Sequence, residues 1–467
     1  MRLKLLAFIM MAVLCSWTVA AQEDQWLPND THRPLPGVVT PSAQSGGAPS
    51  DAVVRAVPQG RWVSAWSTAV QAARSRPGNT QALVFNNQTI RMVVRPTIKG
   101  ERLRVRFSNE FGSTPLEIGS AHVALVKQDG AIVAESDHPL TFGGSTSISV
   151  PAGAPMLSDP VDLKVPAFTE IAVSLFVPKE QAPSTFHLLG QHDTYVSGPG
   201  DFTAANEIET PKVTKAWYWL AGVEFWETDQ SAAIVAFGDS ITDGFAAKAQ
   251  YGDWPNQLAD RLAEGKDTPS LAVDNEGIGG NRILHDGAGV AALARFDRDV
   301  LSQPGVADLI VLEGINDIGW PHMKGRPSPD GTVRQNPWAT QKVSADDLIE
   351  GLKQMVERAH EHGIRVFCAT MTPYGGNTGT FTDDGEAVRQ AVNNWIRKSG
   401  ELDGFVDFDA AVRDPSDPSR FLPAYDSGDH LHPNAAGYKV MAEAINLSVL
   451  RRPASPASLP AKRHRKQ

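Results

Sequence analysis

The sequence predicts two folded parts: an all-β sandwich of the jelly-roll kind over residues 61–228, then an α/β domain with a parallel sheet over 229–450. Three observations support this fold class. Between 61 and 228, short segments alternate apolar and polar residues, with Gly or Pro between them and no convincing amphipathic helix. After 229, apolar strand-like runs alternate with amphipathic helical stretches. The chain of 467 residues is also too long for one ordinary core.

Residues 1–21 have the pattern of a secretory signal peptide. Arg2 and Lys4 precede a short apolar run, and small residues at 19–21 offer a cleavage site. That run is too short to span a bilayer comfortably, and no later stretch is apolar for long enough, so we expect no integral membrane segment. The pattern predicts a secreted or periplasmic protein.

Two further segments have the composition of unfolded chain. Residues 22–60 are rich in Pro, Gly, Ser and Asp without periodicity, and we expect a disordered lead-in. Residues 451–467 end in a basic run, which we expect to be a disordered tail, with contact to anionic polymers or headgroups as the alternative. Without the signal peptide, 41 Lys and Arg face 53 Asp and Glu, a formal charge of −12, which argues against a nucleic-acid partner.

Cysteine usage excludes a disulfide framework and gives no sign of a metal site. Removal of the signal peptide takes Cys15 away and leaves Cys368, which alone cannot form an internal disulfide. Cys368 lies in an apolar run, so it is interpreted as a buried strand residue rather than a nucleophile. No Cys/His cluster has the spacing of metal ligands, and we expect no metal.

Segment 102–107 is typical of the first part. Leu103, Val105 and Phe107 fall on one face and three arginines on the other, which is the period of two of a half-buried antiparallel strand. Similar runs lie at 120–126, 145–150, 171–177 and 217–226.

In the second part, the helix at 344–362 has the clearest signature. Ser344 is a candidate N-cap, an apolar stripe follows, and Gly363 is the stop signal. Two more helices are expected at 384–399 and 434–447. The expected strands are 233–237, 271–275, 307–312, 364–371 and 405–408. Because strands and helices alternate, the sheet is predicted to be parallel and covered on both faces.

The first strand of this part ends at Gly238-Asp239-Ser240. Ser240 is thereby predicted at the carboxyl end of a parallel strand, the edge of an α/β sheet where ligands bind. A serine there can be a nucleophile, or it can be the N-cap of the next helix. This stretch alone leaves both interpretations open.

Other segments supply the partners that a serine nucleophile needs. Asp429 and His432 are three residues apart, so in a tight turn the carboxylate can face one imidazole nitrogen while the other faces Ser240. His430 is a rival base, but as the immediate neighbour of Asp429 it should point elsewhere. Gly280 follows the second strand and Asn316 the third, where they can offer a backbone and a side-chain amide to an oxyanion. Each motif by itself is also ordinary loop or cap chemistry.

In this order, the four blocks resemble those of the SGNH hydrolases, also called GDSL esterases and lipases. The matches are Gly238-Asp-Ser-Ile with Ser240 as nucleophile, the second-block glycine Gly280, the third-block asparagine Asn316, and the final Asp-x-x-His from Asp429 to His432. Ile241 stands where leucine gives the family its common name, a change that conserves volume.

The resemblance implies a flavodoxin-like three-layer α/β/α domain. It also implies a triad of Ser240, His432 and Asp429, and an oxyanion hole made by the amides of Ser240 and Gly280 and the side chain of Asn316. It implies neither a metal nor an organic cofactor. The expected enzyme is a carboxylic ester hydrolase that forms an acyl-enzyme.

Upstream, Trp62-Val-Ser-Ala-Trp-Ser-Thr, Phe85-Asn-Asn-Gln-Thr-Ile-Arg and Phe107-Ser-Asn-Glu-Phe-Gly resemble the β-domain of a secreted bacterial subfamily. Some of its members are associated with xylan breakdown. This similarity implies removal of acetyl or other short acyl groups from carbohydrate, with a small-molecule or polysaccharide ester as substrate.

Alternatives to this function remain open. An arylesterase or lipase would act on esters that contain no carbohydrate, and a polysaccharide-binding protein would use the same scaffold without catalysis. The tryptophans of the first part can stack on sugar rings or pack in a core: Trp62, Trp66, Trp217 and Trp219.

Overall fold

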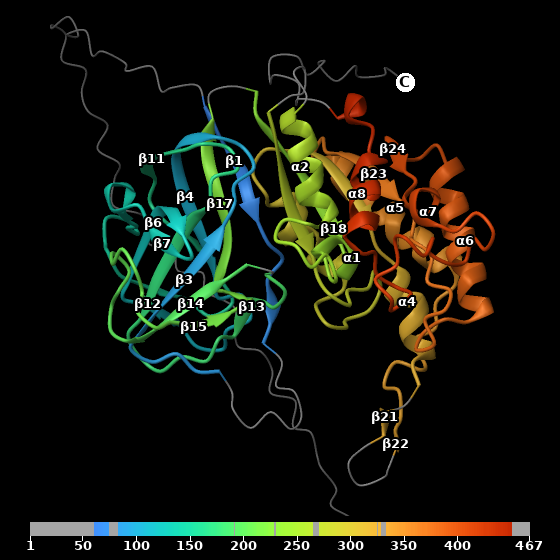
Figure 1. The fold of residues 1–467 in the computed structure, drawn as a ribbon, viewed down its shortest axis with the longest axis horizontal. Helices are drawn as coiled ribbons and strands as arrows, with labels where there is room; N and C mark the ends of the chain where they lie inside the picture. The colour runs from blue at the N-terminus through green and yellow to red at the C-terminus, as the bar shows by residue number, and fades with distance from the viewer. Residues whose placement is uncertain are drawn as a thin grey trace, which may run out of the picture. The chain divides into compact units, whose positions relative to one another are not determined.

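The computed structural model describes residues 60–73, 83–190, 192–227, 230–264, 270–324, 326–327 and 333–450 (Figure 1). These residues belong to one compact unit, Val57–Gln467. The predicted signal peptide, the lead-in and the basic tail lie outside the described residues, as does the expected domain boundary at 228–229, and these stay predictions. No described helix is long and apolar enough to cross a membrane.

The first part is a sandwich of two antiparallel sheets, which confirms the predicted class. One sheet has the order β1 (Arg61–Ser67), β17 (Leu220–Glu227), β4 (Gly100–Ser108) and β10 (Pro155–Leu157), with β11 (Val161–Val165) also paired to β4. The other has the order β15 (Lys212–Thr214), β14 (Thr194–Pro199), β3 (Gln88–Val94), β12 (Ile171–Val177), β6 (Ser120–Gln128) and β7 (Ala131–Ile132), with β8 (His138–Pro139) off β6. Leu103, Val105 and Phe107 share one buried cluster with Met92 and Val173 of the facing sheet.

Two expected strands of this part differ from the prediction. The run 217–226 is split into β16 (Trp217–Tyr218) and β17, because Trp219 takes a left-handed conformation with φ of +57° that buries its ring completely. β16 then pairs with β13 (Thr185–His187), which pairs with β2 (Gln71–Ala72). The run 145–150 shortens to β9 (Ile148–Val150), which pairs with β5 (Leu116–Ile118) in a small sheet of its own.

The second part contains a five-stranded parallel sheet. Its order is β19 (Leu271–Gly277), β18 (Ala232–Gly238), β20 (Val306–Leu312), β23 (Arg365–Ala369) and β24 (Gly404–Val406). Numbered along the chain, this is the flavodoxin-like order 2-1-3-4-5, with its switch point at the first strand. The expected strands 364–371 and 405–408 are shorter than predicted, the latter because Asp407 caps the helix that begins at Phe408.

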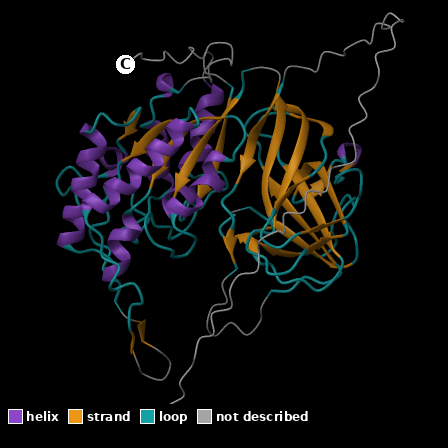
Figure 2. Ribbon diagram, turned by 180° about the vertical axis from the view of Figure 1, so that it is seen from behind, coloured by secondary structure: helices purple, strands orange, loops and turns teal. Residues whose placement is uncertain are grey.

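Helices cover both faces of the parallel sheet (Figure 2). On one face α2 (Trp254–Glu264), α7 (Phe408–Val412) and α8 (Ala435–Glu443) share a buried cluster with the sheet. On the other face α3 (Ala292–Phe296), α5 (Ala345–Glu361) and α6 (Asp383–Lys398) do so. Ser344 caps α5 in a capping box with Asp347, as the sequence signature predicts. The helix expected at 434–447 ends earlier, at Glu443.

Strands β1 and β19 join the two parts. Thr68, just after β1, forms a backbone bridge with Asn275, and the backbone N–H of Val273 donates to Thr97 Oγ1 at 3.0 Å. The arginine face of β4 also contributes, because Arg106 Nη2 donates to Gln303 Oε1 at 2.6 Å. The junction is therefore lined by polar groups that lie out of water.

Asp274 of β19 is fully buried at this junction, and Asp274→Asn is expected to flatten the pH dependence of stability. Burial raises the pKa of Asp274 to about 7, whereas an unfolded chain releases the proton near pH ~3.9. Between these values the folded form keeps a proton that the unfolded form has lost, so this carboxyl destabilises the fold as pH rises, by up to about 4 kcal/mol.

The measurement is the thermal unfolding midpoint of both proteins at about pH 4.5 and about pH 7.5. Asn cannot titrate, so the variant should gain stability relative to the wild type at the higher pH. An identical pH response in the two proteins would contradict the buried, protonated Asp274.

Candidate active site

Ser240 lies directly beyond the carboxyl end of the central strand β18. It is the first residue of a short helix, α1 (Ser240–Asp243), and is 8% exposed. The N-cap of that helix is Asp239, whose side chain accepts the backbone N–H of Ile241 at 2.8 Å. The alternative interpretation of Ser240 as the N-cap is therefore wrong, and its hydroxyl is left for another partner.

That partner is His432. Ser240 Oγ and His432 Nε2 are 2.7 Å apart, although the two residues are separated by 192 positions in the chain. On the far side of the ring, His432 Nδ1 lies 2.6 Å from Asp429 Oδ2. Asp429 Oδ1 also accepts the backbone N–H groups of Leu431 and His432, each at 2.9 Å. The Asp429 carboxylate therefore fixes both the ring of His432 and the backbone of the turn that carries this histidine.

The rival histidine has a different carboxylate. His430 Nδ1 lies 2.5 Å from Asp426 Oδ2, and its backbone has a φ of +60°. The turn thus contains two Asp–His pairs, of which only Asp429–His432 includes a ring that contacts Ser240.

Two carboxyl groups at the site differ in protonation. Partial burial acts to raise the pKa of Asp429, but the hydrogen bonds from the side chain and backbone of His432 outweigh it and hold the pKa well below its usual range. Asp429 is therefore ionised at any ordinary pH. Burial raises the pKa of Asp239 to about 7, although its bond with the Ile241 amide opposes the shift.

Gly280 follows β19 and Asn316 follows β20, the two strands that flank β18. Asn316 lies within the short helix α4 (Ile315–Gly319). Asn316 Nδ2 donates to the backbone O of Asn281 at 3.0 Å and lies 3.4 Å from Asp239 Oδ2. It therefore touches the chain neighbours of both Gly280 and Ser240. The fold brings all five predicted site residues to one edge of the sheet.

Gly280 cannot be replaced without disturbing this edge. Its φ of +78° lies in the region that favours glycine, and a Cβ atom there would stand 2.7 Å from the ring of Trp320. Trp320 in turn packs on Trp338, with ring centroids 4.5 Å apart. The indole of Trp320 therefore forms a wall beside the glycine.

Several residues at the site were missed from the sequence. Arg295 of α3 is buried, and its guanidinium donates to the backbone O of Gly238, the backbone O of Glu276 and the side chain of Asn281. Asp317 accepts the backbone N–H groups of Ile283 and Leu284. Phe245 is 45% exposed, with its ring 4.5 Å from that of His432. No short motif marks Arg295 or Phe245. Asp317 ends the Gly314-Ile-Asn-Asp motif that contains Asn316, but its bonds to the backbone at 283 and 284 join segments distant in sequence.

Residues 236–440 match the model of the GDSL-like Lipase/Acylhydrolase family. Among solved structures, the chain is similar to a GDSL-like lipase from Bacteroides thetaiotaomicron, at 20% identity over 46% of this chain and 87% of the other, with a TM-score of 0.33. It is also similar to an acetylxylan esterase from Geobacillus stearothermophilus, solved as a catalytic mutant, at 22% identity over 46% and 91%, with a TM-score of 0.33. A comparison with curated proteins gives no match.

The family match is specific to the α/β part, and it spans the segments that hold Ser240, Gly280, Asn316 and the Asp429–His432 pair. It confirms the resemblance that those blocks suggest. The chain carries a GDSL-like lipase/acylhydrolase domain and is a carboxylic ester hydrolase.

Proposed function

We propose that the chain hydrolyses esters through an acyl-enzyme on Ser240, with His432 as the base and Asp429 as its orienting carboxylate. One observation carries the proposal: Ser240 Oγ, the two ring nitrogens of His432 and the Asp429 carboxylate form an unbroken chain of contacts of 2.7 and 2.6 Å. A serine needs a base within about 2.6–3.2 Å to become a nucleophile, and the base needs a third group to fix its tautomer.

The reaction runs in two halves. His432 Nε2 takes the hydroxyl proton as Ser240 Oγ bonds to the ester carbonyl carbon, and the carbonyl electron pair moves onto oxygen. When the tetrahedral intermediate collapses, the ester C–O bond breaks and the imidazolium protonates the departing alcohol. Water then gives a proton to the same nitrogen as its oxygen bonds to the acyl carbon. When this second tetrahedral intermediate collapses, the bond from carbon to Ser240 Oγ breaks, the imidazolium returns the proton to Oγ, and the acid leaves. The ionised Asp429 stabilises the imidazolium in both halves.

The oxyanion is assigned to the backbone N–H groups of Ser240 and Gly280 and the Nδ2 group of Asn316. All three follow adjacent parallel strands, and Asn316 is fixed by its bond to the backbone of Asn281. Donors that are held in place before the reaction stabilise developing charge without reorganisation, and loss of one such donor typically slows turnover about 10²–10³-fold.

For the substrate we propose acetyl or another short acyl group on carbohydrate. The Trp320 indole beside Gly280 limits the room next to the oxyanion site, which favours a small acyl group. Partly exposed Trp338, whose ring is tilted by 48° against that of Trp320, offers a ring for a sugar. The four tryptophans for which sugar stacking and core packing were both open are engaged in packing: Trp219 and Trp217 are buried, Trp66 lies edge-on to Trp217, and Trp62 lies edge-on to Trp226.

The two Asp–His pairs in one turn allow a matched test of the mechanism. Asp429→Asn is expected to lower kcat by about 10⁴-fold, because the imidazole loses the partner that fixes its tautomer. Asp426→Asn removes the carboxylate beside the His430 ring but keeps a side-chain oxygen for the backbone N–H groups of Gly428 and His430, so it should stay within about threefold of the wild type. Ser240→Ala is the negative control, because it lacks the nucleophile: hydrolysis of an aryl acetate should fall to background, with no burst of released alcohol.

If Ser240→Ala keeps wild-type turnover, the proposed enzyme is wrong. If Asp426→Asn is the slower of the two carboxylate variants, the base is His430.

The substrate proposal is tested with Trp338→Ala. Loss of one aromatic stacking contact of about 1 kcal/mol should raise KM for an acetylated xylo-oligosaccharide about fivefold. KM for a small aryl acetate should be unchanged, because that substrate does not reach the ring. Trp62→Ala is the control, since Trp62 packs on Trp226 and Arg104 in the sandwich. An equal effect of Trp338→Ala on both substrates would favour an arylesterase.

We propose that residues 1–21 direct export to the periplasm or the medium, and that the β part and the catalytic part meet near residues 228–229. N-terminal sequencing of protein recovered from outside the cytoplasm should begin at Gln22. Recovery of the protein only from the cytoplasm, with Met1 retained, would contradict export.

A further inference from the structure

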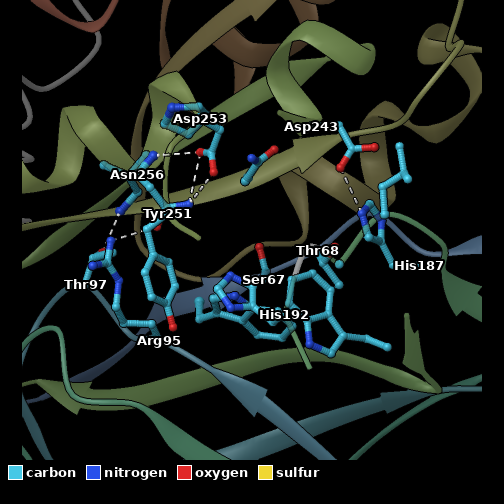
Figure 3. Close-up of a pocket in the computed structure, with 17 residues that line it drawn as sticks. Ser67, Thr68, Arg95, Thr97, His187, His192, Asp243, Tyr251, Asp253 and Asn256 are labelled. Carbon is cyan, nitrogen blue, oxygen red and sulfur yellow. Dashed lines mark hydrogen bonds and ion pairs between the residues drawn. The ribbon is translucent and has the colours of Figure 1, made fainter. Parts of the chain in front are cut away.

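A buried histidine of the β part reaches into the catalytic part. His187, the last residue of β13, is 2% exposed. Its Nδ1 lies 2.8 Å from the backbone O of Ala69, and its Nε2 lies 3.1 Å from Asp243 Oδ1 (Figure 3). Beside an ionised Asp243 both ring nitrogens face acceptors, and only the imidazolium satisfies both, since it donates from both sides.

Charge supports the same protonation state. Burial acts to lower the pKa of His187, but the adjacent Asp243 carboxylate and its hydrogen bond outweigh burial and raise the pKa above its ordinary value. Arg295 of α3 opposes this at longer range. The ring also lies beside Trp217, with centroids 5.6 Å apart. His187 and Asp243 thus form a buried ion pair between the two parts of the chain.

Asp243 connects this pair to the candidate oxyanion loop. It is the last residue of α1, three positions after Ser240, and its Oδ2 accepts the backbone N–H of Gly279 at 3.0 Å. Gly279 is a central residue of a tight turn that is closed by the backbone N–H of Asn281 on the O of Ile278 at 2.9 Å. The other central residue of that turn is Gly280. One carboxylate therefore holds the turn with one oxygen and the histidine with the other.

We infer that His187 is a positioning residue for ester hydrolysis: by fixing Asp243 it holds the Gly279–Gly280 turn so that the Gly280 N–H points at the oxyanion. The inference rests on the proposed function, because it requires Gly280 to be an oxyanion donor. It gives the β part a role at the reaction centre without direct contact with substrate. A donor misplaced by about 1 Å can lower the rate about 10²-fold, so a remote contact of this kind can control turnover.

Three variants at one position separate positioning from packing. His187→Gln keeps an amide N–H near the place of Nε2 and can still donate to Asp243. His187→Asn keeps one near Nδ1 and can donate only to Ala69. His187→Leu keeps bulk and donates to neither. The control is His192→Leu, because His192 is buried in the same region but contacts Gln250 and the rings of Trp217 and Tyr251.

Turnover of an aryl acetate is measured per active site, with sites counted by end-point labelling of Ser240 with a fluorophosphonate. His187→Leu and His187→Asn should lose about ten- to 100-fold in kcat with KM within about twofold, because the oxyanion contact exists only in the transition state. His187→Gln should retain most of the wild-type kcat, and His192→Leu should match the wild type per labelled site.

Three outcomes would overturn the inference: unchanged kcat in His187→Asn, an equal loss in His192→Leu, or an effect on KM alone. If His187→Leu yields no folded protein, the Gln and Asn variants decide the question between them. Failure of this inference is distinguishable from failure of the proposed function, because in the latter case Ser240→Ala itself would stay active.

Discussion

Parallel pairing of β18 on both of its edges is the constraint on which the site depends. Gly238, the last residue of β18, is opposite Gly277 of β19 and Leu312 of β20, so the three strands stop at the same level. The loops that follow them must share one edge of the sheet. Arg295 stabilises this arrangement, because its guanidinium donates hydrogen bonds to the backbone of both β18 and β19. A serine, a glycine and an asparagine far apart in sequence become neighbours as a result.

The same edge gathers buried acidic groups, which the fold tolerates in two ways. Asp299 is paired with Arg295 at 2.8 Å, and with Arg298, and these contacts outweigh burial and keep the pKa of Asp299 low. Glu313 and Asp239 respond differently: burial raises the pKa of each carboxyl, which favours the neutral form. Asp429, at the surface of the site, is ionised like Asp299, because hydrogen bonds from its own turn hold its pKa below the usual range. The carboxylates that stay charged are thus those with a charged or hydrogen-bonding partner, which is an arginine for Asp299 and His432 for Asp429.

Local patterns in the sequence predict much of this fold and few of the contacts between segments that are distant in the chain. Helix α5 is predictable because Ser344, an apolar stripe and Gly363 are all local signals, and β4 is predictable from its alternation. The five candidate site residues can be proposed from the sequence because each follows a recognisable strand or stands in a short motif. The residue that caps α1 is not predictable, since Asp239 and Ser240 are equally good caps by type and only the backbone conformation decides between them. The contacts of Arg295, and that of His187 with Asp243, join segments too distant for any periodicity to reveal.

The most direct measurement is a crystal structure of the protein inactivated by an organophosphonate ester, whose phosphonyl oxygen stands where the oxyanion of the reaction would be. We predict a bond from phosphorus to Ser240 Oγ, with the phosphonyl oxygen within hydrogen-bond distance of Gly280 N–H and Asn316 Nδ2. Modification of another residue, or a phosphonyl oxygen turned away from both donors, would contradict it.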